Sequence, residues 1–231
     1  MILKILIVLE SILKICNWIK CDFMDKDLID EINYEIQLLL KIGFYSDEEI
    51  IEIIDDEFIE EDIPEEKLLE LFSSNRESFE SPKNDSDDFL NLKNAFLNLS
   101  KNHNILAIHN AGYDVEEGIA DAFELFTHLR NNKYEVEGFC FYSFEDIEQA
   151  IDENTLSIAF GDFEYDEEKG LNIAKIVRDE LISNGFDINW NETIDERIEI
   201  ENFNWQKAYE TKEYSMDGAL DDFLELNKKE D

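Results

Sequence analysis

Between residues 89 and 200, short apolar runs alternate with longer segments in which apolar residues recur every three or four positions. Three runs have the length of a buried strand, and two later ones alternate apolar and polar residues as hairpin strands do. The runs are 105–108, 139–142, 156–160, 186–190 and 198–200. This order predicts an α/β domain over residues 89–208, with a mixed sheet in two or three layers that ends in an antiparallel hairpin. A polar stretch, 73–88, predicts the linker before this domain, and residues 209–231 predict a polar tail after it.

Residues 24–80 carry only the helical period and predict an acidic helical region. Gly43 stands where a helix C-terminus favours glycine. Ser46 and Glu49 have the spacing of a capping box at the start of the next helix. Pro64 suits the first turn of a third helix.

The first 23 residues predict an amphipathic extension, because the apolar residues within 2–16 follow helical spacing. Such a helix would pack on the protein or lie at a membrane interface. Glu10 and Lys14 interrupt the apolar run and no small-residue cleavage site follows, which argues against a signal peptide. The run is also too short to span a bilayer, so we expect no stable membrane insertion. As an alternative, translation starts at Met24, just after the acidic composition begins.

The chain of 231 residues has 58 acidic and 20 basic residues, which gives a formal charge of −38. This charge does not indicate disorder, because 44% of the residues are hydrophobic and can form a core. It argues against binding to nucleic acid or to an anionic membrane, since both require an excess of Lys and Arg. It favours a basic partner, a cation, or simply high solubility.

The acidic residues are concentrated in residues 47–70, which hold 13 acids and one base, Lys67. Three interpretations are open: a solvated helix surface, a docking face for a basic protein, or a cation site. The Asp-x-Asp-x-Asp-Gly loop of calcium sites is absent. The residues predicted to bind a partner are Asp47, Glu48, Glu52, Asp55, Asp56, Glu60 and Glu61.

The three cysteines, Cys16, Cys21 and Cys140, are odd in number and irregular in spacing. They do not predict a disulfide framework, and we therefore expect a reducing, cytoplasmic compartment. No further ligands accompany the first two, and the glycine-rich fingerprints of phosphate-binding loops are absent. We expect neither a metal nor a cofactor.

Polar residues follow each of the three expected core strands. His109 follows the first, Tyr142 and Asp146 follow the second, and Asp162 follows the third. If these strands are parallel neighbours, the four side chains converge at one end of the sheet and provide groups for general acid–base catalysis. The alternative is structural: Ser143 caps the next helix with Asp146 at its third position, and Asp162 ends a strand.

A second group consists of Trp190, Arg197 and Trp205. An arginine flanked by tryptophans can bind a carboxylate or stack on aromatic faces. The alternative is that Arg197 braces the predicted hairpin against an acidic neighbour.

Several segments resemble a bacterial family of domains of unknown function, over about residues 25–208. They are GFYSDEEI (43–50), NDSDDFLNLKNAF (84–96), NAGY (110–113), GFCFYSFEDIEQAI (138–151), LSIAFGDF (156–163) and GFDINWNETIDERIEI (185–200), with Trp205 beyond. The set FY-x-x-x-D, A-F-G, W-N-x-T and R-I carries the resemblance. It implies a relative but no reaction. Some members of the family look as if they carry paired cysteines where this chain has residues 109–112. This chain lacks those cysteines, so the resemblance implies no shared metal role.

Together these observations predict a cytosolic bacterial protein whose acidic helical face binds a basic partner, as antitoxin and immunity proteins do. The alternative is a small-molecule enzyme or binding domain that uses the histidine, tyrosine and aspartates at the strand ends. A third possibility is a solvated α/β domain that has neither role.

Overall fold

The computed structural model describes residues 25–61 and 63–228. The chain divides into two compact units, Met1–Ser81 and Pro82–Asp231, and the boundary falls within the predicted linker. The amphipathic helix expected over residues 2–16 lies outside the described residues.

The described part of the first unit is helical, as the sequence predicts. Its elements are α2 (Lys26–Ile42), α3 (Asp47–Glu57), the 3-10 turn η1 (Ile59–Glu61) and α4 (Glu65–Ser78). The apolar stripes of the helices form its core, which includes Ile32, Ile36, Leu39, Ile50, Ile54, Leu68 and Phe72. The buried Asn75 joins α4 to α2, because its Nδ2 donates to Asn33 Oδ1 at 2.6 Å and its Oδ1 accepts from Gln37 Nε2 at 2.9 Å.

The predicted helix ends of this unit are confirmed. Gly43 terminates α2 in the left-handed region, with φ of 76°, where glycine avoids the steric cost of a Cβ. Ser46 and Glu49 form a complete capping box on α3: the Ser46 hydroxyl accepts from Glu49 N at 3.2 Å, and the Glu49 carboxylate accepts from Ser46 N at 2.7 Å. Pro64 lies immediately before α4, at its N-cap.

The second unit alternates helices and strands. In order they are α5 (Asp87–His103), β1 (Ile105–Ile108), α6 (Val115–Asn131), β2 (Gly138–Phe141), α7 (Phe144–Glu153), β3 (Thr155–Gly161), α8 (Glu167–Ser183), β4 (Asp187–Asn189), β5 (Ile198–Glu201) and α9 (Met216–Leu226). Each strand lies within one residue of its predicted bounds. The fold is therefore a helical N-terminal region followed by an α/β domain with a mixed sheet.

The five strands form one sheet in the order β1-β2-β3-β5-β4. Only the pair β1 and β2 is parallel among the strands described here, and β4 and β5 form the predicted antiparallel hairpin. The expectation that β3 runs parallel to its neighbours is wrong: Phe139 pairs with Gly161 and Phe141 with Ala159, which is an antiparallel register. The reason is the connection through α7, which is capped by Asn154 in a left-handed conformation. The chain then enters β3 at the same end of the sheet at which β2 ended, so the two strands run in opposite directions.

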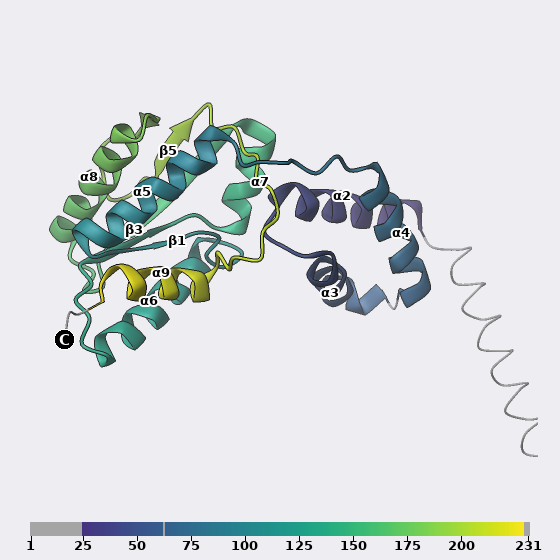
Figure 1. The fold of residues 1–231 in the computed structure, drawn as a ribbon, viewed down its shortest axis with the longest axis horizontal. Helices are drawn as coiled ribbons and strands as arrows, with labels where there is room; N and C mark the ends of the chain where they lie inside the picture. The colour runs from purple at the N-terminus through teal and green to yellow at the C-terminus, as the bar shows by residue number, and fades with distance from the viewer. Residues whose placement is uncertain (1–24, 62, 229–231) are drawn as a thin grey trace, which may run out of the picture. The chain divides into compact units, whose positions relative to one another are not determined.

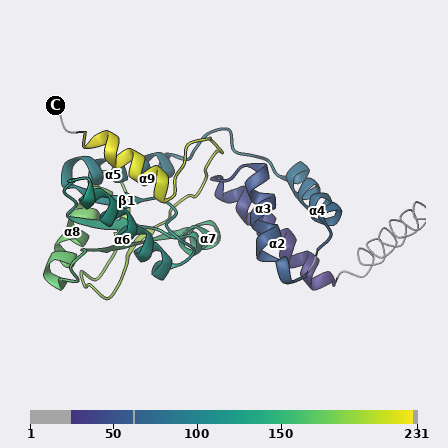
Figure 2. The same ribbon diagram turned by 90° about the horizontal axis from the view of Figure 1, so that it is seen from below.

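The second unit has three layers (Figures 1 and 2). Helices α5 and α8 contact each other on one face of the sheet, and α8 contacts β2, β3 and β4. On the other side, α6 and α9 contact each other and the edge strand β1, while α7 packs against β3. The alternation of side chains along the strands therefore buries both faces of the sheet.

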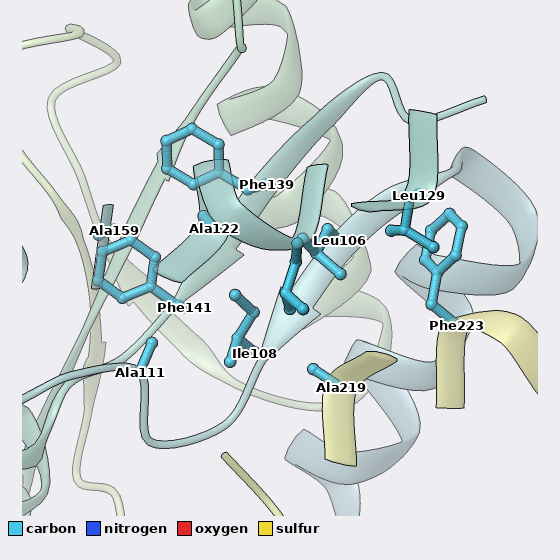
Figure 3. Close-up of a cluster of buried hydrophobic side chains, with 11 residues drawn as sticks. Leu106, Ile108, Ala111, Ala122, Leu129, Phe139, Phe141, Ala159, Ala219 and Phe223 are labelled. Atoms are coloured by element: carbon cyan, nitrogen blue, oxygen red, sulfur yellow. The ribbon is translucent and has the colours of Figure 1, made fainter. Parts of the chain in front are cut away.

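Figure 3 shows the apolar cluster beneath α6 and α9. Alternate residues of β1 and β2 point into it, and α9 adds Ala219 and Phe223. Phe223 is fully buried, and its ring lies edge-on to Tyr134. Within the segment expected to be a polar tail, α9 therefore contributes to the core of the domain.

Candidate functional site

The acidic residues predicted to bind a partner lie on the surface of the helical unit. The exposed set, called here the acidic surface, is Asp47, Glu48, Glu52, Asp55 and Asp56 on α3, with Glu60 and Glu61 on η1. The same helix buries Ile50 and Ile54. The amphipathic pattern thus holds the carboxylates in water while the apolar residues anchor the helix.

One carboxylate of the acidic surface has a cationic partner among the residues described: Arg76 Nε lies 3.0 Å from Asp47 Oδ1. The other six form no ion pair with any described residue. Burial, and secondarily the negative charge of Glu31, raises the pKa of the neighbouring Glu57. The acidic surface therefore carries a negative potential that a cationic group would reduce.

Two of the residues predicted at the strand ends meet. His109 follows β1 and Tyr142 follows β2. Because these strands are parallel neighbours, both residues lie at the same end of the sheet, where the strands end. His109 Nδ1 and Tyr142 Oη share a hydrogen bond of 2.7 Å. His109 stacks on Phe96 of α5 with 4.6 Å between ring centroids, and Trp205 packs edge-on against Tyr142.

The pair formed by His109 and Tyr142 is not poised for acid–base chemistry at neutral pH. Burial, assisted by the positive charges of Lys212, Lys93 and Lys207, lowers the pKa of His109 to about 3, so its imidazole is neutral at pH 7. Burial also raises the pKa of Tyr142 well above its usual value. The cavity beside His109 has room for about one water molecule. The arrangement therefore supports a structural hydrogen bond in the core.

Asp146 is buried and its oxygens bind two different elements. Its Oδ2 accepts from Ser143 N and Ser143 Oγ, at 2.9 Å each, which completes the capping box predicted for α7. Its Oδ1 accepts from Arg197 at 2.6 Å, so the carboxylate joins α7 to the start of β5. These partners engage both oxygens of Asp146 in structural contacts.

Asp162 and His109 lie at opposite ends of the strands, because β3 runs antiparallel to β2. The Asp162 carboxylate accepts from the backbone N–H groups of Glu164 and Asp166, at 2.9 Å each, and shapes the turn before α8. The four residues expected to converge are therefore not brought together. Only His109 and Tyr142 contact each other.

The group of Trp190, Arg197 and Trp205 is brought together only in part: Trp190 and Arg197 line one cleft of about 400 Å³ beside the β4–β5 loop, whereas Trp205 does not line it. Trp190 Nε1 donates to the carbonyl groups of Thr193 and Glu196, at 3.1 Å each, within the β4–β5 loop. Trp205 packs on Phe89 at 5.6 Å between ring centroids. Arg197 pairs with the buried Asp146, as the bracing interpretation requires.

A cluster of charged side chains around Tyr214 has no counterpart in the sequence predictions. We define the Tyr214 cluster as Lys93, Lys207, Glu210, Lys212 and Tyr214. The ammonium groups of Lys207, Lys93 and Lys212 lie 5.0, 5.2 and 5.4 Å from the centroid of the tyrosine ring, within the range of cation–π attraction. Tyr214 donates a hydrogen bond to Glu210.

The Tyr214 cluster joins the C-terminal segment to α5, because Lys93 of α5 contacts Glu210 and Tyr214. Burial alone would raise the pKa of Glu210, but the bond from Tyr214 and the charges of Lys207 and Lys93 lower it to about 2. Lys207 is 1% exposed, and its ammonium group lies 3.3 Å from Glu210 and 3.8 Å from Asp85. Lys93 and Glu210 are 117 residues apart. The sequence could therefore have indicated this cluster only through the lysines near Tyr214, and not through Lys93.

In the part of the chain that the structure describes, no group of three His, Cys, Asp or Glu side chains is arranged to hold a metal ion. None of the helices in that part is long and apolar enough to cross a membrane.

Comparison with known proteins identifies a family without assigning a reaction. Searches of curated proteins and of solved structures returned no match to this chain. A family model described as a domain of unknown function (DUF6891) matches residues 25–209, which include both the helical unit and the sheet. The chain therefore belongs to the DUF6891 family of domains of unknown function.

Proposed function

We propose that this protein is an acidic interaction module of the bacterial cytoplasm whose helical unit binds a basic protein, as antitoxin and immunity proteins do. The observation that carries the proposal is the acidic surface, on which six of seven carboxylates form no ion pair with a described residue. A packed helical core holds these groups on fixed elements, since Ile50 and Ile54 are buried beneath them.

Electrostatic complementarity explains what such a surface contributes to binding. Exposed carboxylates accelerate the encounter with a basic partner and disfavour acidic ones, and salt screens both effects over roughly 8–10 Å at physiological ionic strength. Because the groups are hydrated in the free protein, we expect the partner to supply several Lys or Arg side chains rather than one.

The geometry supports the enzyme alternative less well. The cleft beside His109 and the cleft beside Asp162 are separate, and neither is lined by another of the four residues. Acid–base partners must reach a common substrate, and the antiparallel β3 removes Asp162 from the edge where His109 lies.

The experiment compares two variants that each lose four negative charges. The first neutralises the acidic surface with Glu52→Gln, Asp55→Asn, Asp56→Asn and Glu60→Gln. The matched control neutralises exposed acids of the second unit with Glu135→Gln, Glu137→Gln, Asp152→Asn and Glu225→Gln. Tagged full-length chains are used to capture partners from the native lysate at about 0.1 M and at about 1 M salt.

We expect a basic protein to be retained by the wild type and by the control variant at low salt, and to be lost from the acidic-surface variant. The same protein should elute at high salt. Retention that is unchanged at 1 M salt, or that falls equally in both variants, contradicts the proposal.

A further inference from the structure

The second unit contains a cleft of about 310 Å³ where β3 ends and α8 begins. This volume is at the lower end of the range for small-molecule sites. The walls come from α6, β2, the end of β3, the first turn of α8 and the β4–β5 loop. The cleft lies at the opposite edge of the sheet from His109, and no residue of the acidic surface lines it.

Aromatic rings form much of the lining. Phe123 of α6, Phe139 of β2 and Phe160 of β3 contribute apolar surface, and Tyr165 stands at the mouth. The rings of Phe123 and Tyr165 stack at 5.4 Å between centroids, with 19° between their planes. Tyr165 as a residue is nevertheless 79% exposed, so it remains accessible to a ligand.

The remaining polar lining is acidic. Asp162 is 7% exposed and accepts two backbone hydrogen bonds, but it forms no ion pair with a described residue. Glu167 and Asp195 line the cleft with exposed side chains. Asp166, which also lines it, caps α8 by accepting from Glu168 N and Lys169 N. None of the described lining residues is a lysine, arginine or histidine.

These features select a class of ligand. One base lies near the cleft, Lys169, which pairs with Glu164 and interacts with the charges of Asp166 and Asp162. The four carboxylates of the lining outnumber it and repel phosphate and carboxylate ligands, whereas a purely apolar ligand would leave them uncompensated. An ammonium group gains from the carboxylates and from the negative faces of aromatic rings, and an attached apolar body gains from burial against the phenylalanines.

We propose that this cleft binds a small organic ammonium compound that carries an apolar body. The cationic group lies between Tyr165 and the carboxylates of Glu167 and Asp195, and the apolar body lies against Phe123 and Phe139. This site is independent of the proposed partner surface on α3 and η1.

The probe is benzyltrimethylammonium, titrated into the full-length chain and followed by calorimetry and by NMR shifts. Choline and its uncharged isostere 3,3-dimethylbutan-1-ol separate the effect of charge from that of shape. We expect saturable binding of benzyltrimethylammonium, weaker binding of choline, and binding of the alcohol at least about tenfold weaker than that of choline. Added salt should weaken the binding of both cations.

Variants locate the site. Two variants should each weaken the binding of benzyltrimethylammonium by about threefold to tenfold. They are Tyr165→Ala and the double change Glu167→Gln with Asp195→Asn. Tyr209→Ala and Glu135→Gln remove an exposed ring and an exposed charge outside the cleft, and should leave binding unchanged. The acidic-surface variant of α3 and η1 should also bind the probe normally, which separates this inference from the proposed function.

Three results would overturn the assignment. The first is equal binding of choline and its uncharged isostere, and the second is an equal loss of affinity in the control variants. The third is the absence of saturable binding of benzyltrimethylammonium up to about 10 mM. Binding of a lysine- or arginine-containing peptide in its place would not rescue the assignment. Urea unfolding of the Tyr165 and Glu167/Asp195 variants verifies that a loss of binding does not reflect a loss of fold.

Discussion

The two units of this chain differ in where their carboxylates form ion pairs. In the helical unit, the carboxylates of the acidic surface lie in water, and only Asp47 has a cationic partner among the residues described. In the sheet unit, several carboxylates are paired: Asp146 with Arg197, Glu210 with Lys207 and Lys93, and Asp222 with Lys212. The difference teaches that ion pairs with buried members join distant elements of the second unit, whereas the carboxylates of the acidic surface contribute no such contact to the first.

The largest effect should come from the core of the sheet unit. Phe223→Ala removes a fully buried ring of α9 and should lower the free energy of unfolding by about 3–5 kcal/mol. Urea unfolding measures the loss, and Asp221→Ala on the exposed side of α9 is the control. If Phe223→Ala costs no more than the control, α9 is not part of the core and the sheet unit ends before it.

The buried imidazole should make the sheet unit sensitive to acid. His109 has a folded pKa of about 3, below its usual 6.5, so below pH 6.5 the unfolded chain binds a proton that the folded chain does not. This contribution to stability is complete above pH 6.5 and is lost towards pH 3, by up to about 1.4 kcal/mol per pH unit.

The check is urea unfolding at pH 7, 6, 5 and 4 for the wild type and for His109→Gln, which cannot titrate in this range. We expect the wild type to lose stability relative to the variant as the pH falls. A difference that stays constant with pH would show that the histidine is accessible to protons in the folded state.

Breaking the pair of Arg197 and Asp146 should cost about 2–3 kcal/mol. Arg197→Met leaves a carboxylate that is 2% exposed without its cation, although the bonds from Ser143 remain. Asp146→Asn and the double variant complete a cycle, from which chemical denaturation gives a coupling energy. Additive losses would mean that the pair does not stabilise the sheet unit.

The smallest effect should come from the helical unit. Ser46→Ala removes the capping box of α3 and should destabilise this unit by about 1 kcal/mol. Amide hydrogen exchange measures it locally, with Ser73→Ala within α4 as the control for loss of an exposed hydroxyl. Faster exchange throughout the sheet unit as well would contradict the view that the two units are stabilised separately.

Local features were predictable because they depend on neighbours in the sequence. The apolar runs located the strands within one residue, and Ser46, Ser143 and Gly43 marked helix ends, since capping acts over three or four positions. The exposure of the acidic residues on α3 followed from the same helical period.

The direction of β3 was not predictable in this way. A helical segment between two strands does not specify at which end of the sheet the chain enters the next strand. The antiparallel direction of β3 places Asp162 at the end of the sheet away from His109. The contribution of α9 to the core was also missed: its apolar residues Ala219, Leu220, Phe223 and Leu224 have helical spacing, but the sequence does not show that β1 and α6 provide a surface for them.

The sequence by itself thus determined the elements, their caps and the acidic surface, since each depends on contacts within one turn of helix or on alternation along a strand. Tertiary structure decided which distant side chains meet. Lys93 contacts Tyr214 and Arg197 binds Asp146 because elements that are far apart in the chain pack together. The cleft at the end of β3 depends on that packing in the same way.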